Sequence, residues 1–522
     1  MENTNSKKKM SSAKRKKKRV RKAFRIAGEI LVGIQILATL VFIGFTWRLG
    51  IIPAKYVVGF AALLLVFAAL LFTMQVVTRG KAIVSKIVSV LMSAVLIFGS
   101  VYVYQTHDAI EDISGDTLGK QVHSVLVVVR KDDEAEKVWD TKDYVYGVQS
   151  IEDDSEMAEA MKKVNADAGK EVLTKEFDTL NDQVAGLLSE AVDAIVYDES
   201  FSGIIEEVNE NYNSKVKVIA QYSIESKSDS MTQGVSPDVN VKDEPFSMFI
   251  SGIDVYGPIS SKSRSDVNII ATVNPETKQI LLTNTPRDFY VTIPEVSGEK
   301  KDKLTHAGIY GVDKSMAALE ELYDIEIPFY TRVNFTSLIT MVDLMGGVDV
   351  ESEFEFTTSG AGGEIMDVKK GINHFNGAQA LSFARERYNV PGGDNQRGKD
   401  QMAVIQAMFK KMITPEMLVK APKMISEVSN SVETNMSMEQ IQRLIQSQID
   451  NGGEWTIKSV AAEGTGDQAF CYSAPGTALY VTIPDETSVA NIKVLMDKVE
   501  NGEMLPSDTP NETGEAVRSE ER

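Results

Sequence analysis

The sequence predicts a membrane-anchored α/β protein, with three N-terminal transmembrane helices followed by two α/β units. Three observations lead to this prediction. Apolar stretches fill most of the first hundred positions, a basic run precedes them, and strand-like and helix-like patterns alternate through the rest of the chain. The chain has 522 residues, of which 43% are hydrophobic and 25% charged, so it is long enough for more than one globular domain.

The apolar stretches cover residues 26–45, 56–77 and 83–104. Each has close to the ~20 residues that cross the hydrocarbon core of a bilayer as a helix. A cleaved signal peptide is the alternative for the first stretch, but two further apolar stretches follow it and no small-residue cleavage site precedes a mature domain. The sequence therefore predicts a basic tail over residues 1–25 and three spans within residues 26–104.

Positive charge predicts the orientation of these spans. Residues 1–104 hold 17 Lys and Arg against two Asp and Glu, although the whole chain has a formal net charge of -19. The positive-inside rule places the basic tail in the cytoplasm, so an odd number of spans places the domains after them outside the cell. Arg79 and Lys81 then fall in a cytoplasmic loop, and Trp47 and Tyr56 at the outer interface. A nucleic-acid-binding arm is the alternative, but topology and anionic lipid account for the charge, so we expect no nucleic-acid partner.

The first α/β unit is predicted over residues 121–226. Alternating apolar residues predict strands at HSVLVVVR, YVYGVQ and KVKVIAQYSIE, and helical periodicity predicts helices at SEMAEAMKKVNAD and TLNDQVAGLLSEAVDAIVYD. This accessory unit contains no recognisable catalytic motif. The polar stretch over residues 227–245 predicts a linker.

The second α/β unit is predicted over residues 246–499. It begins with the strand SMFISGIDVYG, and the strands NIIATVN and QILLTNTP flank the turn PETK as a hairpin. Helices are expected at SMAALEELYD, at TSLITMVDLMGG and at QMAVIQAMFKKM, whose apolar spacing predicts one buried face, and strands at VDVES and WTIKSVAA. Residues 500–522 are polar and acidic, and we expect them to be disordered.

Charged residues cluster at three places in this second unit, each at the end of a predicted element. The segments are GIDVYGPISSKSRSD, TNTPRDFY and LSFARERYNVPGGDNQRGKDQ. They supply Asp254, Arg264, Asp266, Arg287, Asp288, Arg385, Arg387, Asp394, Arg397 and Gln401. Strand ends and the loops after them are where α/β proteins usually hold ligands.

Arginines grouped with carboxylates suit the binding of a pyrophosphate and its metal ion. Arginine recognises phosphate oxygens in a planar, bidentate way and stays charged at physiological pH. Carboxylates recruit Mg2+, which fills its remaining positions with phosphate oxygen and water. Taken one at a time, the same residues could equally form surface ion pairs. The residues alone therefore predict a membrane-anchored, phosphate-handling α/β domain.

Other catalytic chemistries find little support. The sequence has no Walker A loop, no GxSxG and no CxxC motif. The single cysteine, Cys471, cannot form an intrachain disulfide. We expect His306 to be a turn or core residue, and His107, His123 and His374 have no visible partners, so zinc is not expected.

Five separated motifs in one order resemble the LytR-CpsA-Psr family of bacterial cell-envelope proteins. They are SMFISGIDVYG, SRSDVNIIATVNPETKQILLTNTPRDFYVTIP, KLTHAGIYG, VNFTSLITMVDLMGGVDV and GINHFNGAQALSFARER followed by GGDNQRGKDQ. The resemblance covers residues 246–412, about a third of the chain, within a motif core of 246–414. The three-span anchor and the accessory unit resemble the capsule-type CpsA branch. The resemblance implies that the second unit is a mixed-sheet α/β catalytic domain.

The resemblance also implies an activity. Members of this family are phosphotransferases that move a glycopolymer, of capsular polysaccharide or teichoic acid type, from a polyprenyl pyrophosphate carrier to peptidoglycan, at the muramic acid 6-hydroxyl. The implied partners are the lipid-linked glycan donor, peptidoglycan, the membrane and the capsule synthesis machinery, in a Gram-positive type envelope. Two other functions stay open: a non-catalytic polyprenyl-phosphate-binding regulator of capsule synthesis or chain length, and simple pyrophosphate hydrolysis, which could also be a side activity.

The resemblance assigns roles by position. Asp254 and Asp266 would hold Mg2+, with Mn2+ as the alternative metal. The implied pyrophosphate-binding residues are Arg264, Arg287, Arg385, Arg387, Arg397 and Gln401. The implied catalytic residues are Arg264, Asp266, Arg287 and Asp394, of which Asp394 would orient the arginines or act as a base. The helix over residues 401–412 would form a wall of a lipid tunnel or, alternatively, simply pack in the core.

The sequence departs from the family at one position. Many members read Arg-x-x-Arg-Gln where this chain has Arg397-Gly398-Lys399-Asp400-Gln401, so Asp400 replaces an arginine. Lys399 could supply the missing charge from the adjacent position, although a lysine does not reproduce the bidentate fork of arginine. No role is assigned to Asp400.

Overall fold

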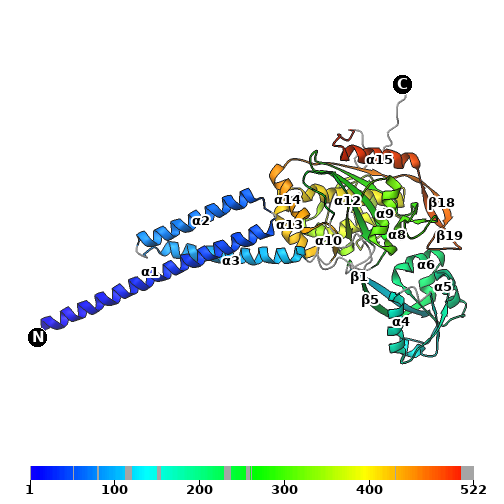
Figure 1. Cartoon of the computed structure of the whole chain (residues 1–522), viewed down its shortest axis with the longest axis horizontal. Helices are drawn as coiled ribbons and strands as arrows, with labels where there is room; N and C mark the ends of the chain where they lie inside the picture. Colours follow the sequence, from blue (N-terminus) through cyan, green and yellow to red (C-terminus); the bar gives the residue numbers. More distant parts are fainter. Residues whose placement is uncertain are drawn as a thin grey trace, which may run out of the picture. The chain divides into compact units, whose positions relative to one another are not determined.

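Figure 1 shows the computed structural model of the protein. It describes residues 2–50, 52–78, 81–111, 120–149, 155–227, 237–253, 259, 262–361, 363–428 and 431–506. The chain forms two compact units. One comprises Met1–Glu111 with Met438–Gly453, and the other comprises Asp112–Ser437 with Glu454–Arg522.

The first unit contains three long helices, α1 (Glu2–Leu49), α2 (Ala54–Val77) and α3 (Ile83–Glu111). Their segments Arg15–Leu49, Ala54–Val77 and Ile83–Tyr104 are long and apolar enough to cross a membrane. This confirms the three predicted apolar helices. The basic tail is also helical, as the N-terminal part of α1.

A short helix from late in the chain, α14 (Met438–Asn451), belongs to this first unit. Gln442 donates a hydrogen bond to the carbonyl oxygen of Leu49 at 2.7 Å, and Lys55 pairs with Asp450 at 2.9 Å. The sequence placed these residues in one continuous domain over 246–499. The structure instead groups α14 with the apolar helices, because it contacts the turn between α1 and α2.

The accessory unit is a five-stranded sheet with the order β3-β2-β4-β1-β5. β1 is antiparallel to β4 and β5, whereas β2 is parallel to β3 and β4. The strands are β1 (Lys120–Arg130), β2 (Val145–Val148), β3 (Leu173–Glu176), β4 (Ala194–Asp198) and β5 (Val216–Lys227). The helices are α4 (Ser155–Ala168), α5 (Leu180–Leu188), α6 (Ser202–Val208) and α7 (Tyr212–Lys215).

One predicted helix of this unit is wrong in its second half. The prediction ran through TLNDQVAGLLSEAVDAIVYD, but α5 ends at Leu188 and the segment AIVYD forms β4. Glu190 has φ 63°, a left-handed conformation that ends the helix. β4 pairs with strands on both sides, and its Ala194, Ile195 and Val196 are fully buried. Burial on both faces removes the alternation that marks a strand, so the apolar run resembled a helix.

The second α/β unit is built on a six-stranded mixed sheet with the order β16-β11-β6-β7-β8-β17. β6, β7 and β8 are antiparallel neighbours, whereas β11 is parallel to β6 and β17 is parallel to β8. This confirms the mixed-sheet α/β fold, including the predicted hairpin. The strands are β6 (Phe246–Ile253), β7 (Ser265–Asn274), β8 (Gln279–Asn284), β11 (Phe329–Val333), β16 (Val432–Thr434) and β17 (Thr456–Ala461).

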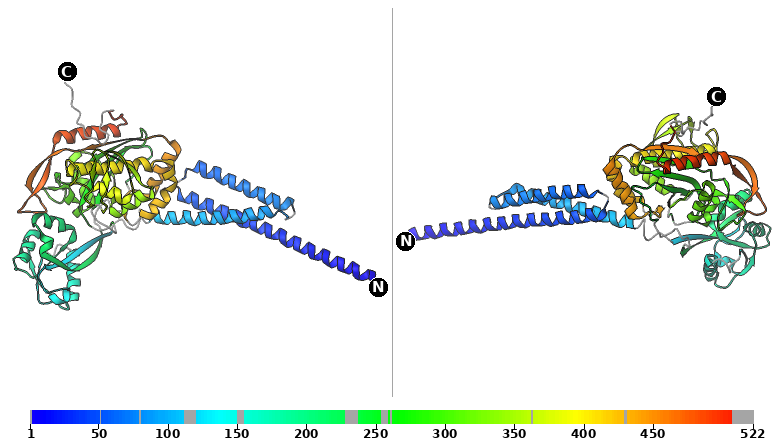
Figure 2. Two further views of the ribbon diagram at one scale, coloured as in Figure 1. Left: turned by 180° about the vertical axis from the view of Figure 1, so that it is seen from behind. Right: turned by 45° about the horizontal axis from the view of Figure 1, so that its top comes forward.

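Helices and short ribbons complete the unit. The helices are α8 (Leu304–Tyr310), α9 (Val312–Tyr323), α10 (Phe335–Leu344), α11 (Gly377–Ala384), α12 (Asp394–Met412), α13 (Pro415–Val428) and α15 (Glu486–Glu500). The ribbons pair β9 (Tyr290–Thr292) with β10 (Lys301–Lys303), β12 (Val348–Ser352) with β15 (Gly371–Phe375), β13 (Phe356–Thr357) with β14 (Asp367–Val368), and β18 (Gly464–Phe470) with β19 (Ala478–Pro484). Figure 2 gives two further views of the sheet and its helices.

Alternation along β6 separates the two faces of the sheet. Phe249 packs into a hydrophobic core with residues of α9 and α15, whereas Met248 and Ile250 on the opposite face line a cavity. A second hydrophobic core forms among α10, α11, α12 and α13. The cavity therefore lies against one face of the sheet, beside this second core.

The first residues of the predicted disordered tail, 500–506, differ from the prediction. Leu505 is buried in the core beside α9 and α15, and its backbone N–H donates to Gln279 Oε1 at 2.9 Å. Residues 500–506 are thus ordered by apolar burial, contrary to the expected disorder. The remaining residues of the predicted tail lie outside the described ones.

Candidate functional site

The cavity against the sheet has a volume of about 740 Å3. Its lining includes most of the site residues predicted from the sequence: Arg264, Asp266, Arg287, Arg385, Arg387, Arg397 and Gln401. Asp254 lies outside the described residues. Asp394 is the first residue of α12, and its side chain also lies outside what the structure describes. Residues from three separate charged segments thus meet at one cavity.

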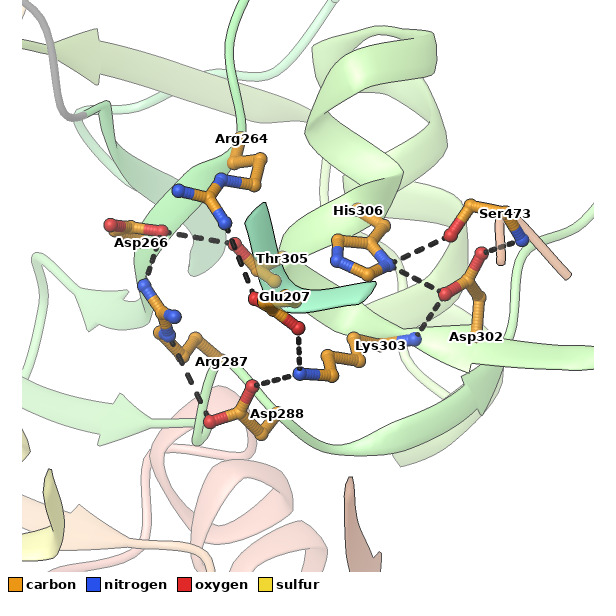
Figure 3. Close-up of polar contacts among 10 residues, drawn as sticks. All are labelled: Glu207, Arg264, Asp266, Arg287, Asp288, Asp302, Lys303, Thr305, His306 and Ser473. Carbon is orange, nitrogen blue, oxygen red and sulfur yellow. Dashed lines mark hydrogen bonds and ion pairs between the residues drawn. The ribbon is translucent and has the colours of Figure 1, made fainter. Parts of the chain in front are cut away.

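Two neighbouring strands supply the first part of the site. Asp266 lies in β7, and Arg287 follows the end of β8. Asp266 Oδ1 accepts from Arg287 Nη1 at 2.9 Å and from Thr305 Oγ1 at 3.0 Å (Figure 3). Burial opposes the charge of Asp266, but Arg287, Arg264 and Arg397 outweigh it and lower the pKa of this carboxyl group. Asp266 is therefore an anion within a cationic group.

The end of α11 supplies two further arginines. Arg385 caps the C-terminus of α11, and its guanidinium lies 4.3 Å from the centre of the Phe335 ring. Arg387 follows, with its Cζ 4.8 Å from the centre of the Tyr388 ring, and Nη2 donates to Tyr388 Oη at 2.6 Å. An aromatic face attracts a cation and restrains a long side chain. Each arginine is thus held by an aromatic neighbour.

Helix α12 joins the polar and apolar parts of the cavity. Gly398 allows its first turns to approach the sheet, since a Cβ atom there would lie 2.6 Å from Asn284 Nδ2. From Arg397 to Met412 the helix rises about 22 Å. Along that length its cavity-lining residues change from Arg397 and Gln401 to Val404, Ile405, Met408, Phe409 and Met412. The helix also packs in the core, as the alternative expected, and its role as the wall of a lipid tunnel stays a prediction.

Asp400 and Lys399 lie outside the cavity lining among the described residues. Asp400 is 3% exposed and accepts a hydrogen bond from Gln396 Nε2 at 3.0 Å. Lys399 faces Glu353 at 4.0 Å. Lys399 is not among the lining residues of the cavity, so the lining gives no support to the expectation that it replaces the missing arginine charge, which stays a prediction. The cationic side of the cavity consists of arginines.

A divalent cation is compatible with this donor set. Among the described residues no three His, Cys, Asp or Glu side chains converge as a metal site. Mg2+ nevertheless needs only one or two carboxylates when phosphate oxygens and water supply the other ligands. Asp266 is an ionised carboxylate beside the arginines, so it fits this role, and the contribution of Asp254 stays a prediction.

Two charged residues near Asp288, Glu207 and Lys303, were not indicated by the sequence (Figure 3). Lys303 donates to Glu207 Oε2 at 2.6 Å and lies 3.3 Å from Asp288 Oδ1. Glu207 belongs to α6 of the accessory unit and lines the same cavity. Asp288 stood in a charged motif without a role, but only the folded chain brings Glu207 to it.

The histidines contribute little to this site. His306 is fully buried and lies 2.7 Å from Asp302 Oδ1 and 3.0 Å from Ser473 Oγ, as expected of a core histidine. His123 and His374 each contact one carboxylate. His107 lies in α3, and its side chain is outside the described part of the chain.

The part of the chain that carries the site is similar to known proteins. The model of the LytR_cpsA_psr family matches residues 207–496. A Bacillus cereus protein named polyisoprenyl-teichoic acid–peptidoglycan teichoic acid transferase TagU is 34% identical over 231 residues, which are 44% of this chain and 73% of that protein. A protein of the same name from Enterococcus faecalis is 31% identical over 248 residues, which are 47% of this chain and 78% of that protein. The crystal structure of B. subtilis TagV covers 50% of this chain and 98% of its own, with 26% identity and a TM-score of 0.41. The chain belongs to the LytR-CpsA-Psr family.

Proposed function

We propose that this protein is a membrane-anchored phosphotransferase that moves a glycopolymer from a polyprenyl pyrophosphate carrier to peptidoglycan outside the cell. The names of its TagU relatives support this substrate class. The three apolar helices support a membrane anchor. The N-terminus would be cytoplasmic and the domains extracellular, with the capsule synthesis machinery as a further partner.

The observation that carries the proposal is the graded lining of the cavity along α12. A polyprenyl pyrophosphate has a multiply charged head and a long hydrocarbon tail. Arginine forks match the head, and the apolar residues from Val404 to Met412 match the tail. A soluble nucleotide or a free pyrophosphate would not need an apolar wall of this length.

The reaction requires one bond to form and one to break. The acceptor hydroxyl oxygen attacks the phosphorus next to the glycan, the bond from that phosphorus to the bridging oxygen breaks, and polyprenyl phosphate leaves. The arginines Arg264, Arg287, Arg385, Arg387 and Arg397 would bind the phosphate oxygens, supported by Gln401. Asp394 is the proposed base for the hydroxyl proton. Mg2+ or Mn2+, held by Asp266 and Asp254, would supply further charge neutralisation when bound.

A transfer assay tests the proposal. The full chain in nanodiscs is incubated with a polyprenyl pyrophosphate-linked glycan, peptidoglycan and Mg2+, and wall-bound glycan is measured by mass spectrometry. We expect transfer that EDTA abolishes and that Asp266→Ala lowers by at least about a hundredfold. Binding without transfer would favour the non-catalytic regulator, whereas glycan phosphate released equally without acceptor would favour hydrolysis. Activity that survives Asp266→Ala would remove the metal-dependent mechanism. Donors of capsular and teichoic acid type, compared side by side, identify the polymer.

A further inference from the structure

Helix α6 brings the accessory unit into the wall of the cavity. Gly203, Glu206 and Glu207 of this helix are lining residues. The other side of α6 is anchored on the second α/β unit, because Ile204 is fully buried in a cluster with Ile309, Cys471, Ala474, Leu479 and Val481. The helix is thus held by apolar contacts while one face meets the charged site.

On that face of α6, Gly203 and Glu207 form the contact surface for Arg264. A Cβ atom on Gly203 would overlap the guanidinium of Arg264, so the absence of a side chain lets this group rest directly on the helix. One turn later, Glu207 Oε1 lies 3.4 Å from Arg264 Nη1. Figure 3 shows Arg264 and Lys303 approaching Glu207 from different sides. Gly203 and Glu207 therefore restrain the same cation by shape and by charge.

The second partner of Glu207 keeps its carboxylate in place. Lys303 is 3% exposed, donates to Glu207 Oε2 at 2.6 Å and also contacts Asp288 at 3.3 Å. Burial opposes the charge of Glu207, but Lys303, together with His306 and Arg264, outweighs it and lowers the pKa of this carboxyl group. Glu207 lies on an anchored helix and contacts both the buried Lys303 and Arg264, so its carboxylate is held in place. A fixed carboxylate is better suited to supporting Arg264 than to occupying the phosphate site until a ligand displaces it.

We infer that Gly203 and Glu207 are positioning residues for Arg264, so that the accessory unit completes the phosphate-binding site of the second unit. The inference rests on the proposed function, in which Arg264 contacts the pyrophosphate. The accessory unit would then be required for the affinity of the site, and not only for recruiting polymer or partner enzymes.

Gly203→Ala tests whether the close approach of Arg264 to α6 matters for binding. Alanine favours a helix, so α6 should keep its fold, and the three atoms nearest to the new Cβ all belong to the flexible end of Arg264. We expect the full chain in nanodiscs, titrated with geranyl pyrophosphate and Mg2+ by calorimetry, to bind about tenfold more weakly. In an Arg264→Ala background the same change should alter Kd by less than about twofold, because its target is gone.

Two substitutions of Glu207 test the charge. Glu207→Gln keeps an acceptor for Arg264 and should retain most of the affinity, whereas Glu207→Ala should weaken binding about as much as Gly203→Ala. The matched control is Glu210→Gln, an exposed carboxylate just after α6, which should leave Kd unchanged. Tighter binding by both Glu207 variants would mean that Glu207 competes with the ligand, and it would overturn the inference.

The outcomes separate this inference from the proposed function. If the unchanged chain does not bind geranyl pyrophosphate, the proposed function and the inference both fall. If the unchanged chain binds and Gly203→Ala binds equally well, the inference alone is wrong. An equal loss from Gly203→Ala with and without Arg264 would also overturn it, because the effect would then not pass through that arginine.

Discussion

Asp400 is a buried carboxyl group on α12, and burial raises its pKa to about 7. In the unfolded chain the same group has a pKa of about 3.9. Between these values the folded state holds a proton that the unfolded state has lost, so the free energy of unfolding falls as pH rises from about 4 to about 7. We expect wild type to be less stable at pH 8 than at pH 5 by about 2.6 kcal/mol from this group.

Asp400→Asn should remove that dependence, since the amide keeps the shape and carries no charge. Thermal unfolding between pH 5 and pH 8 measures the difference, with the exposed Asp467→Asn as the matched control. The variant should match wild type at pH 5 and exceed it at pH 8. Equal pH profiles for the wild type and the Asp400 variant would show that this carboxyl group does not hold the proton.

Phe335 supports Arg385 through its ring, with the guanidinium carbon 4.3 Å from the ring centre. Phe335→Leu keeps an apolar side chain but removes the aromatic face, so the arginine should lose part of its restraint. We expect affinity for geranyl pyrophosphate to fall about threefold, in line with ~0.5–1 kcal/mol for a cation–π contact. Phe335→Tyr keeps the ring and should bind like wild type, and a Tyr variant as weak as the Leu variant would argue against the contact.

Because the lining of the cavity along α12 changes from polar to apolar, we expect the phosphate head and the hydrocarbon tail of the ligand to be recognised by different parts of this helix. Ile405 faces the cavity, whereas Lys410 on the same helix is exposed. Ile405→Trp should fill apolar volume, so a long polyprenyl phosphate should bind at least about fivefold more weakly while inorganic pyrophosphate binds as before. Lys410→Trp is the matched control and should change neither affinity. Equal losses for both ligands with Ile405→Trp would place this residue outside the lipid path.

The elements also show where sequence patterns are sufficient. The β7–β8 hairpin and the Gln401–Met412 part of α12 were predictable because alternation and helical spacing are local properties. The first turns of α12, Asp394–Asp400, were not predicted as a helix. β4 was not, because a strand buried on both faces loses its alternation. Glu207 was missed for a different reason: its partners Arg264 and Lys303 are far along the chain, and no spacing within α6 indicates them.

The site depends on segments from across the chain. The arginines could be predicted as a group, because charged motifs at element ends resemble a known family. Their supports could not, since Phe335, Tyr388 and Gly203 are ordinary residues whose effect comes only from contact. The departure at Asp400 was visible in the sequence, but its burial away from the cavity was not.

The predicted orientation of the chain in the membrane can be tested by cysteine labelling, because the chain has a single cysteine. Cys471 is 2% exposed, and burial raises the pKa of its thiol to about 12, so it should not react with a maleimide. New cysteines at the exposed positions Lys17→Cys and Glu244→Cys then report on opposite sides of the spans. In intact cells a membrane-impermeant maleimide should label Glu244→Cys alone, and permeabilisation should add Lys17→Cys. The protein without an introduced cysteine is the control, and it should show no labelling of Cys471. Labelling of Lys17→Cys in intact cells would show that the topology is the opposite of the predicted one. The cavity would then lie in the cytoplasm, where it could not reach peptidoglycan.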